Sequence, residues 1–174
     1  DGRLDENRVT VNTRLVLALS ALEYDVTDVA GHDLLRAFSD FDSVTKQGLN
    51  GVAYTLLALD SRDYEIPEAE KGAKQTTRDA LVDYLLEAQL ADGGWAYGGE
   101  TALGIDPQTD ARFVKNGVNA LDSLCSFYAE GGGFRHTMRG ERDELATTQG
   151  YYALAAYWRM TQEKTPLYDM SDLD

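Results

Sequence analysis

Few residues in this sequence could support metal or thiol chemistry. Among 174 residues there is one cysteine, Cys125, and there are two histidines, His32 and His136. Thiolate and imidazole groups bind zinc readily, but three such side chains cannot form a His-rich or Cys-rich zinc cluster. A single cysteine also excludes a disulfide within the chain. We therefore expect no structural zinc site.

Aromatic side chains are the second group with potential chemistry. The sequence contains ten Tyr, five Phe and two Trp. Rings on apolar helices can line a ligand cavity or stabilise a carbocation, whereas the same rings can pack a core with their hydroxyls at its rim. Core packing is the favoured interpretation. If there is a ligand site, the rings we expect to form it are Tyr54, Trp95, Tyr151 and Trp158.

Charge and hydropathy exclude several kinds of partner. The 16 basic and 30 acidic residues give a formal charge of −14, which repels phosphate backbones and anionic lipid. No stretch approaches the roughly 20 apolar residues that span a bilayer. We expect neither nucleic-acid binding nor membrane insertion. Because the sequence starts at Asp1 without an initiator Met, we also expect a fragment of a longer chain.

The spacing of apolar residues predicts an all-α domain over 1–174. Alternation typical of strands is nearly absent, and glycine clusters fall between segments with helical spacing. The predicted helices cover residues 9–23, 31–42, 47–60, 74–90, 110–130 and 143–161.

These helices are of two chemical kinds. Those at 9–23, 47–60 and 143–161 are apolar on nearly every side, so we expect protein to surround them. Those at 74–90 and 110–130 carry one apolar stripe and a polar face that we expect to be exposed to solvent. The stripes consist of Leu81, Tyr84, Leu85 and Ala88, and of Val118, Leu121, Leu124, Cys125 and Tyr128. Alternation of the two kinds is typical of an array of helical hairpins.

A glycine loop followed by an aromatic residue occurs twice. Asp92-Gly93-Gly94-Trp95 and Gly131-Gly132-Gly133-Phe134 each follow an amphipathic helix, and Trp95 and Phe134 are 39 residues apart. Glycine can stop a helix, and the ring after it can fold back between hairpins. We predict repeat junctions near 92–99 and 131–134 and a mostly buried Trp95. The less favoured alternative is a chance likeness of two glycine-rich loops.

The segment 96–109 interrupts this pattern. Thr101–Pro107 looks like the end of an inner helix, yet only Ala96–Glu100 separates it from Trp95, where about a dozen residues are needed. Either an inner helix is absent, which we favour, or the segment is a long loop. An absent helix would leave apolar stripes uncovered, so we expect self-association through this gap or inward movement of a neighbouring hairpin. The stripes concerned are Leu81, Leu85, Val118, Leu121 and Leu124.

Leu85–Trp95 resembles the repeat of the prenyltransferase and squalene-cyclase superfamily, whose helical hairpins close into an α/α toroid. Two further stretches look like toroid domains of large secreted or cell-surface proteins of Gram-positive gut bacteria: Gly48–Pro67, and Gly131–Thr137 with Thr148–Tyr157. This resemblance covers nearly the whole chain. It implies a toroid like that of transcobalamin and intrinsic factor, which the missing stretch at Gly99–Thr101 would leave incomplete.

The resemblance does not carry the acid chemistry of the cyclases. Those enzymes protonate an alkene with a D-x-D-D cluster, and no such string occurs here. The nearest strings, Asp40-Phe41-Asp42 and Asp60-Ser61-Arg62-Asp63, fall at predicted helix ends. There we expect caps or solvated loop charges rather than an acid catalyst.

Zinc catalysis of the prenyltransferase type also lacks its ligands. Asp122 occupies the position of the Asp ligand in the metal-bearing segment of those enzymes, but Cys125 is one residue after the position of their Cys ligand. A shift of one residue turns a helical side chain by about 100°, so the sulfur would not face the same point as the carboxylate. Thr148 occupies the position of the His ligand. We interpret Cys125 as a small buried hydrophobe and His136 as an exposed loop residue.

The favoured hypothesis is a non-catalytic toroid module of an exported bacterial protein. The resemblance implies an extracellular or cell-surface location and a role in ligand capture, with a corrinoid-like ligand, or in adhesion to a surface partner. A terpenoid cyclase or prenyltransferase-type enzyme is the second hypothesis, and a degenerate structural repeat is the third. No catalytic residue, metal or cofactor is assigned.

Overall fold

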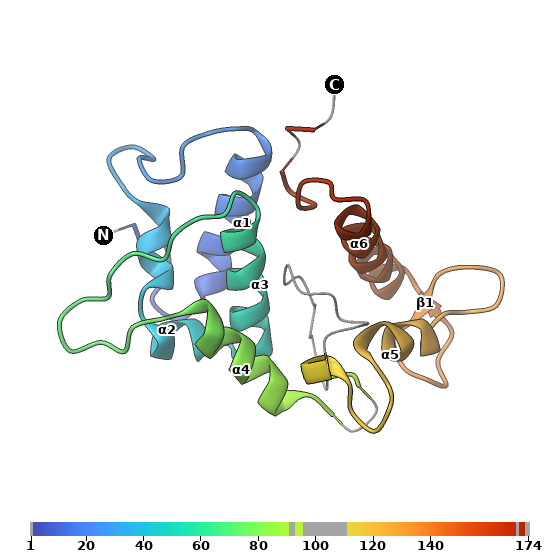
Figure 1. The fold of residues 1–174 in the computed structure, drawn as a ribbon. Coiled ribbons are helices and arrows are strands. Elements are labelled where there is room, and N and C mark those ends of the chain that lie inside the picture. Colours follow the sequence, from blue (N-terminus) through green and yellow to red (C-terminus); the bar gives the residue numbers. More distant parts are fainter. Residues whose placement is uncertain (1, 91–92, 96–110, 170, 173–174) are drawn as a thin grey trace.

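The fold was analysed in a computed structural model that describes residues 2–90, 93–95, 111–169 and 171–172. Helices dominate these residues, and one two-stranded sheet accompanies them (Figure 1). This confirms the all-α class. In chain order the elements are α1 Val9–Ala21, the 3-10 helix η1 Leu34–Phe38, α2 Phe41–Thr45, α3 Gly48–Asp60, α4 Arg78–Ala88, the 3-10 turn η2 Ala111–Phe113, α5 Ala120–Ser126, β1 Phe134–Arg135, β2 Arg142–Asp143 and α6 Glu144–Thr161.

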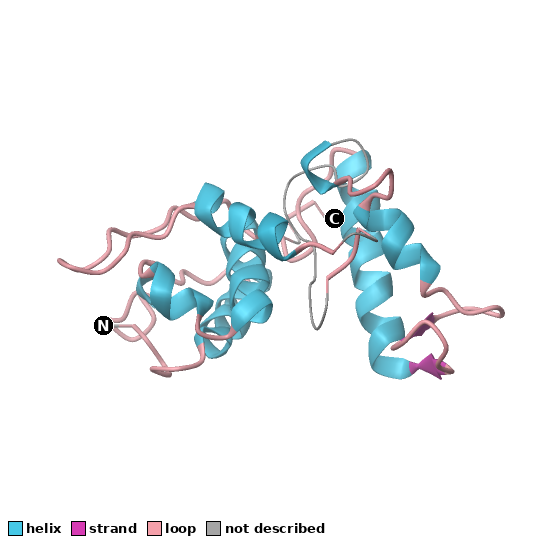
Figure 2. Ribbon diagram, turned by 90° about the horizontal axis from the view of Figure 1, so that it is seen from below, coloured by secondary structure: helices cyan, strands magenta, loops and turns pink. Residues whose placement is uncertain are grey.

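The helices form two groups. Figure 2 shows α1 to α4 gathered in one, and α5, α6 and the β1–β2 hairpin in the other. In the first group α1 and α3 lie side by side, while η1, α2 and α4 cover them. Their shared core is apolar and nearly solvent-free, and its largest members include Val16, Phe38, Val52, Leu56, Leu59, Leu81 and Leu85.

The amphipathic character predicted for the fourth helix is confirmed. Leu81 and Leu85 of α4 are fully buried against the core, whereas Asp83 and Glu87 are exposed. Thr77 starts the helix, since its side chain accepts a hydrogen bond from the backbone N–H of Ala80. The expectation that this stripe faces a gap is therefore wrong for α4, because α3 covers it. The segment 96–109, on which that expectation was based, lies outside the described residues.

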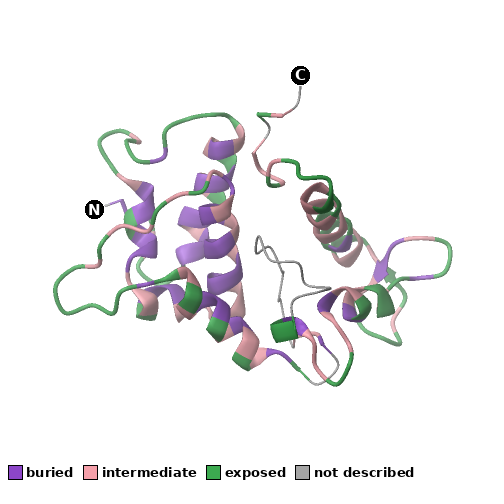
Figure 3. Cartoon of the chain, in the orientation of Figure 1, coloured by how far each residue is buried: buried purple, intermediate pink, exposed green. Residues whose placement is uncertain are grey.

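Helix α6 does not have the surroundings that its apolar sequence predicts. Only Gly150 of its eighteen residues is buried, and Figure 3 shows the helix mostly intermediate or exposed. The hairpin β1–β2 is the principal described neighbour of the helix. The prediction that protein surrounds all three apolar helices thus holds for α3, holds only in part for α1, where Arg14 and Ala18 are exposed, and is wrong for α6.

The helix predicted over 110–130 is much shorter than expected. Asn116 and Gly117 both have positive φ, and the backbones of Lys115 and Val118 exchange two hydrogen bonds of 2.9 Å across them. This is a tight turn of the kind that Asn-Gly favours, and no helix can continue through it. Helix α5 starts only after Asn119, whose side chain accepts from the N–H of Asp122.

The helix predicted over 31–42 is divided in two. Asp33 caps η1, and Asp40 caps α2 by accepting a hydrogen bond from the N–H of Asp42. An N-cap residue has extended backbone, so Asp40 separates the two short helices. The remaining predicted helices agree with α1, α3, α4 and α6 to within a few residues.

The three apolar helices end in the same turn. The N–H of Tyr24 donates to Leu19 O after α1, that of Tyr64 to Leu59 O after α3, and that of Lys164 to Arg159 O after α6, at 2.8 to 3.0 Å. The residue before each donor is acidic and left-handed: Glu23, Asp63 and Glu163 have φ of 62°, 51° and 54°. This is the Schellman ending of a helix, usually made with glycine.

Candidate functional site

The two glycine loops share two backbone hydrogen bonds. The N–H of Leu90 donates to Gly94 O and that of Gly93 to Leu90 O, at 2.8 and 3.0 Å. Thirty-nine residues later, Ala129 donates to Gly133 O and Gly132 to Ala129 O at the same two distances. Gly93 and Gly132 both have positive φ. The described parts of the two loops therefore share two hydrogen bonds and one left-handed glycine, but they differ at the next position, where Gly133 has positive φ and Gly94 does not.

In the first loop, Trp95 folds back onto α4. Its indole Nε1 donates to Leu85 O at 2.7 Å, and its ring lies 6.5 Å from that of Phe113. Trp95 is half-buried, less than predicted. The buried amide of Gln89 links the first glycine loop to η2, since its Nε2 donates to Gly93 O and Phe113 O at 2.8 and 3.0 Å.

In the second loop, Phe134 is fully buried between two tyrosines. Its ring lies 5.5 Å from Tyr128 and 5.7 Å from Tyr151, both edge-on. Thr147 of α6 fixes the loop, because its Oγ1 accepts from the N–H of Phe134 at 2.9 Å. A hydrogen bond with Tyr151 raises the pKa of the Tyr128 phenol above its ordinary value. These contacts attach α6 to the loop.

The four rings proposed for a ligand site fall into two pairs. Tyr54 and Trp95 pack against the core of α1 to α4, and the guanidinium of Arg14 lies 5.8 Å from the Tyr54 ring. Tyr151 and Trp158 lie on α6 and are 47% and 54% exposed. Their roles therefore differ: the first pair is embedded in the fold, whereas the second presents ring surface to solvent.

Tyr151 and Trp158 form one line along α6. They are seven residues apart, and about 100° per residue returns a side chain almost to the same direction after seven. Lys164 lies near the end of the line, with its Nζ 5.9 Å from the Trp158 ring. At the other end the Tyr151 hydroxyl accepts from the N–H of Gly133 at 3.3 Å. We call Tyr151 and Trp158 the aromatic line.

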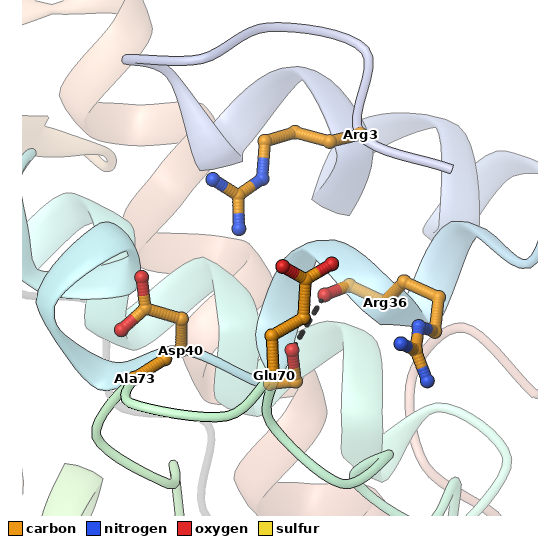
Figure 4. A pocket seen from close by; sticks show the side chains of 6 residues that line it. Arg3, Arg36, Asp40, Glu70 and Ala73 are labelled. Carbon is orange, nitrogen blue, oxygen red and sulfur yellow. Dashed lines mark hydrogen bonds between the residues drawn. The ribbon is translucent and has the colours of Figure 1, made fainter. Parts of the chain in front are cut away.

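A small polar pocket, which the sequence did not indicate, lies beside η1 and α2. Its volume is about 180 Å³, below the roughly 300 to 1,000 Å³ of usual small-molecule sites. Figure 4 shows Arg3, Asp40 and Glu70 around it, with Arg36 to one side. The full lining is Arg3, Arg36, Ser39, Asp40, Glu70 and Ala73.

Two of the charges that line this pocket, those of Arg3 and Asp40, already serve the fold. Asp40 accepts from the N–H of Asp42 at 3.2 Å and from the hydroxyl of Ser43 at 2.6 Å, and Arg3 Nη1 donates to that hydroxyl at 3.3 Å. The prediction that Asp40 is a helix cap is confirmed. The pocket is suited to water or a small ion rather than to a corrinoid.

The other acidic string also has a structural role. Asp60, at the end of α3, pairs with Arg78 at the start of α4, and Arg78 Nη2 donates to Tyr64 O at 3.1 Å. Burial raises the pKa of Asp60, although the charge of Arg78 acts in the opposite direction. The pair joins two consecutive helices, so Asp60 is less solvated than expected.

The residues that were considered for zinc are not assembled into a site. Among the residues that the structure describes, no group of three or more His, Cys, Asp or Glu side chains could hold a metal ion. Cys125 is exposed on α5, so its interpretation as a buried hydrophobe is wrong. The helix presents Ala120 and Ser123 to the interior instead. His136 is exposed in its loop, as predicted.

Comparisons with known proteins identify no relative: no protein-family model, curated protein or solved structure matches the chain. Within the described residues, none of the helices combines the length and apolar character needed to cross a membrane.

Proposed function

We propose that this chain is a non-catalytic module of helical repeats in an exported bacterial surface protein. In this proposal the aromatic line of α6 captures a ligand or a surface partner, and α1, α3 and α6 belong to the inner ring of an α/α toroid. The observation that carries the proposal is the pair of glycine loops with the same hydrogen bonds, 39 residues apart. Repeat architectures of this kind commonly present extended binding surfaces.

The common ending of the apolar helices supports the toroid. Helices α1, α3 and α6 finish in the same left-handed turn, while α4 and α5 lead into the glycine loops. Two kinds of helix with two kinds of ending are what the inner and outer helices of a toroid would give.

The chemistry of the exposed groups supports binding over catalysis. Asp40 and Asp60 have structural roles, whereas Tyr151 and Trp158 present about half of their surface. Tyrosine and tryptophan are enriched at binding interfaces because their rings bury large apolar areas while the tyrosine hydroxyl and the indole N–H can form hydrogen bonds. Trp95 and Tyr54, embedded in the fold, are assigned to its stability.

Titration with cyanocobalamin, followed calorimetrically, tests corrinoid capture. Trp158→Ala and Tyr151→Ala should abolish the binding seen with the natural sequence, while Tyr24→Ala, also exposed but outside α6, should preserve it. Equal binding by all three variants would contradict the use of the aromatic line. If the natural sequence does not bind, corrinoid capture is wrong, and adhesion is tested with the same variants on immobilised mucin.

The enzyme alternative is tested with squalene and with farnesyl diphosphate plus a cysteine-containing peptide, in the presence of Zn²⁺. Turnover of either substrate above the rate without protein would overturn the proposal of a non-catalytic module. The same assay on Cys125→Ala would show whether the thiol takes part.

A further inference from the structure

Two asparagines in the sequence, Asn50 and Asn116, are each followed by glycine and then valine. An Asn-Gly pair can modify itself, because no side chain on the glycine hinders the approach of its backbone nitrogen to the asparagine amide. The identical local sequence predicts similar reactivity at both places. The structure gives them opposite surroundings, since Asn116 lies in the turn between η2 and α5 and Asn50 lies in α3.

The turn at Asn116 and Gly117 is held at its ends and open at its centre. The backbones of Lys115 and Val118 exchange hydrogen bonds of 2.9 Å, while both central residues are exposed. A Cβ on Gly117 would meet no atom within 4 Å beyond its chain neighbours, so the space beside its backbone is open. Exposed backbone of this kind opens at a small cost in free energy.

The pair in α3 is held more firmly. Gly51 is buried, and a Cβ at this position would overlap the carbonyl oxygen of Val44. Asn50 is half-buried. Because a helix fixes the backbone dihedrals on both sides of the Asn50–Gly51 bond, ring closure between these residues requires α3 to unfold locally. Helix α3 belongs to the core of the first helix group, where such opening is costly.

We infer that Asn116 is a site of spontaneous conversion to aspartate and β-linked aspartate, and that α3 protects Asn50 from the same reaction. The Gly117 nitrogen attacks Cγ of Asn116 and closes a five-membered succinimide ring. The side-chain amide nitrogen leaves as ammonia, taking the proton of the Gly117 nitrogen. Water then opens the ring at either carbonyl carbon, so that one water is consumed and one ammonia is released. This inference goes beyond the proposed function and does not depend on it.

The β-linked product should disturb the first glycine loop. It inserts one additional carbon atom into the backbone, and a two-residue turn of this length cannot then keep both Lys115–Val118 hydrogen bonds. The loop approaches this backbone closely, since a Cβ on Gly93 would lie 2.9 Å from the carbonyl oxygen of Val118. We therefore expect the conversion of Asn116 to loosen the contact between the turn and the loop.

Incubation of the natural chain at neutral pH, followed by peptide mapping with mass spectrometry, tests the inference. In the folded chain Asn116 should convert at least about tenfold faster than Asn50, whereas in unfolding concentrations of urea the two rates should agree within about twofold. Equal rates in the folded chain would overturn the inference, as would no conversion of Asn116 over a time that modifies both sites in urea. A rate ratio that persists in urea would overturn the role assigned to α3.

The variant Asn116→Asp is the matched control for the structural effect, because it carries the charge of the product on an ordinary backbone. The β-linked form, separated chromatographically from the aspartate form, should unfold at a lower urea concentration than Asn116→Asp does. Equal midpoints would contradict the proposed loosening of the turn and the loop.

Discussion

The indole of Trp95 donates its hydrogen bond to the carbonyl oxygen of Leu85, at 2.7 Å. Leu85 is three residues before Ala88, the last residue of α4, so its carbonyl is one of the last four that have no partner within the helix. The aromatic residue after the glycine loop therefore caps the helix before the loop. One side chain thus joins the residue after the glycine loop to α4 and satisfies a backbone acceptor.

Trp95→Phe should lower the free energy of unfolding by about 1 to 2 kcal/mol, because it keeps the ring but leaves the Leu85 carbonyl without its donor. Urea unfolding followed by circular dichroism measures the change. Trp158→Phe is the matched control on the exposed side of α6 and should alter stability by less than about 0.5 kcal/mol. Equal losses in the two variants would show that the indole hydrogen bond contributes nothing.

Gly150 allows α6 to approach the second loop. A Cβ at this position would lie 2.5 Å from Cδ2 of the buried Phe134 ring. Although alanine favours helix over glycine by about 1 kcal/mol, we expect Gly150→Ala to be destabilising by about 1 to 3 kcal/mol, since the overlap requires the ring to move.

Thermal unfolding measures this effect, and a second substitution separates overlap from other causes. Phe134→Leu removes the ring edge that the new methyl group would meet. Gly150→Ala should therefore be less harmful in the Phe134→Leu background than in the natural sequence. A larger Tm for Gly150→Ala alone than for the natural sequence would contradict the proposed overlap.

Acid should release the C-terminal segment that follows α6. Arg159 Nη2 donates to Asp172 Oδ1 at 2.5 Å, and this bond lowers the pKa of the Asp172 carboxyl from its ordinary 3.8. A carboxyl with a lowered pKa in the folded chain stabilises the fold above pH 3.8, and the contribution is lost as the pH falls through the folded pKa. Tyr168 of the same segment packs against the core of α1 to α4.

Asp172→Asn should therefore be less stable than the natural sequence at pH 7, and the difference should shrink below pH 3.8. Urea midpoints measured at several pH values test this. In an Arg159→Met background the substitution should have a much smaller effect at pH 7, because only the weaker contacts of Asp172 with Thr165 and Lys164 remain. A difference that stays constant with pH would exclude the ion pair as its cause.

Local sequence signals predicted part of this fold well. The ranges of α1, α3, α4 and α6 follow from apolar spacing, and the glycine loops follow from their composition. The break before α5 could also have been found, since Asn116-Gly117 is a strong turn signal within the predicted helix 110–130. Helical spacing outweighed that signal because Val118, Leu121 and Leu124 fit an apolar stripe.

Burial could not be predicted from the same signals. Leu81 and Tyr152 both stand on apolar helical positions, yet the first is fully buried and the second is half-exposed. The difference depends on whether another element lies against the helix, which is a property of the tertiary arrangement. Cys125 is exposed for a related reason: α5 starts after Asn119, and its buried positions are Ala120 and Ser123.

The turn that ends α6 contains a residue, Glu163, whose replacement should stabilise the fold. Glu163 has a φ of 54°, a left-handed conformation that disfavours a side chain, and its carboxylate lies at the negative end of the helix dipole. Glu163→Gly removes both effects while keeping the backbone bond from Lys164 to Arg159. We expect a gain of about 1 kcal/mol, or a rise in Tm of about 2 to 4 °C for a chain of this size. Differential scanning calorimetry measures it.

Glu163→Ala is the control, because it removes the charge but keeps the strained backbone, and it should recover only the smaller, electrostatic part of the gain. Equal rises for Gly and Ala would assign the whole effect to charge, and no rise for either would contradict the strain at this turn.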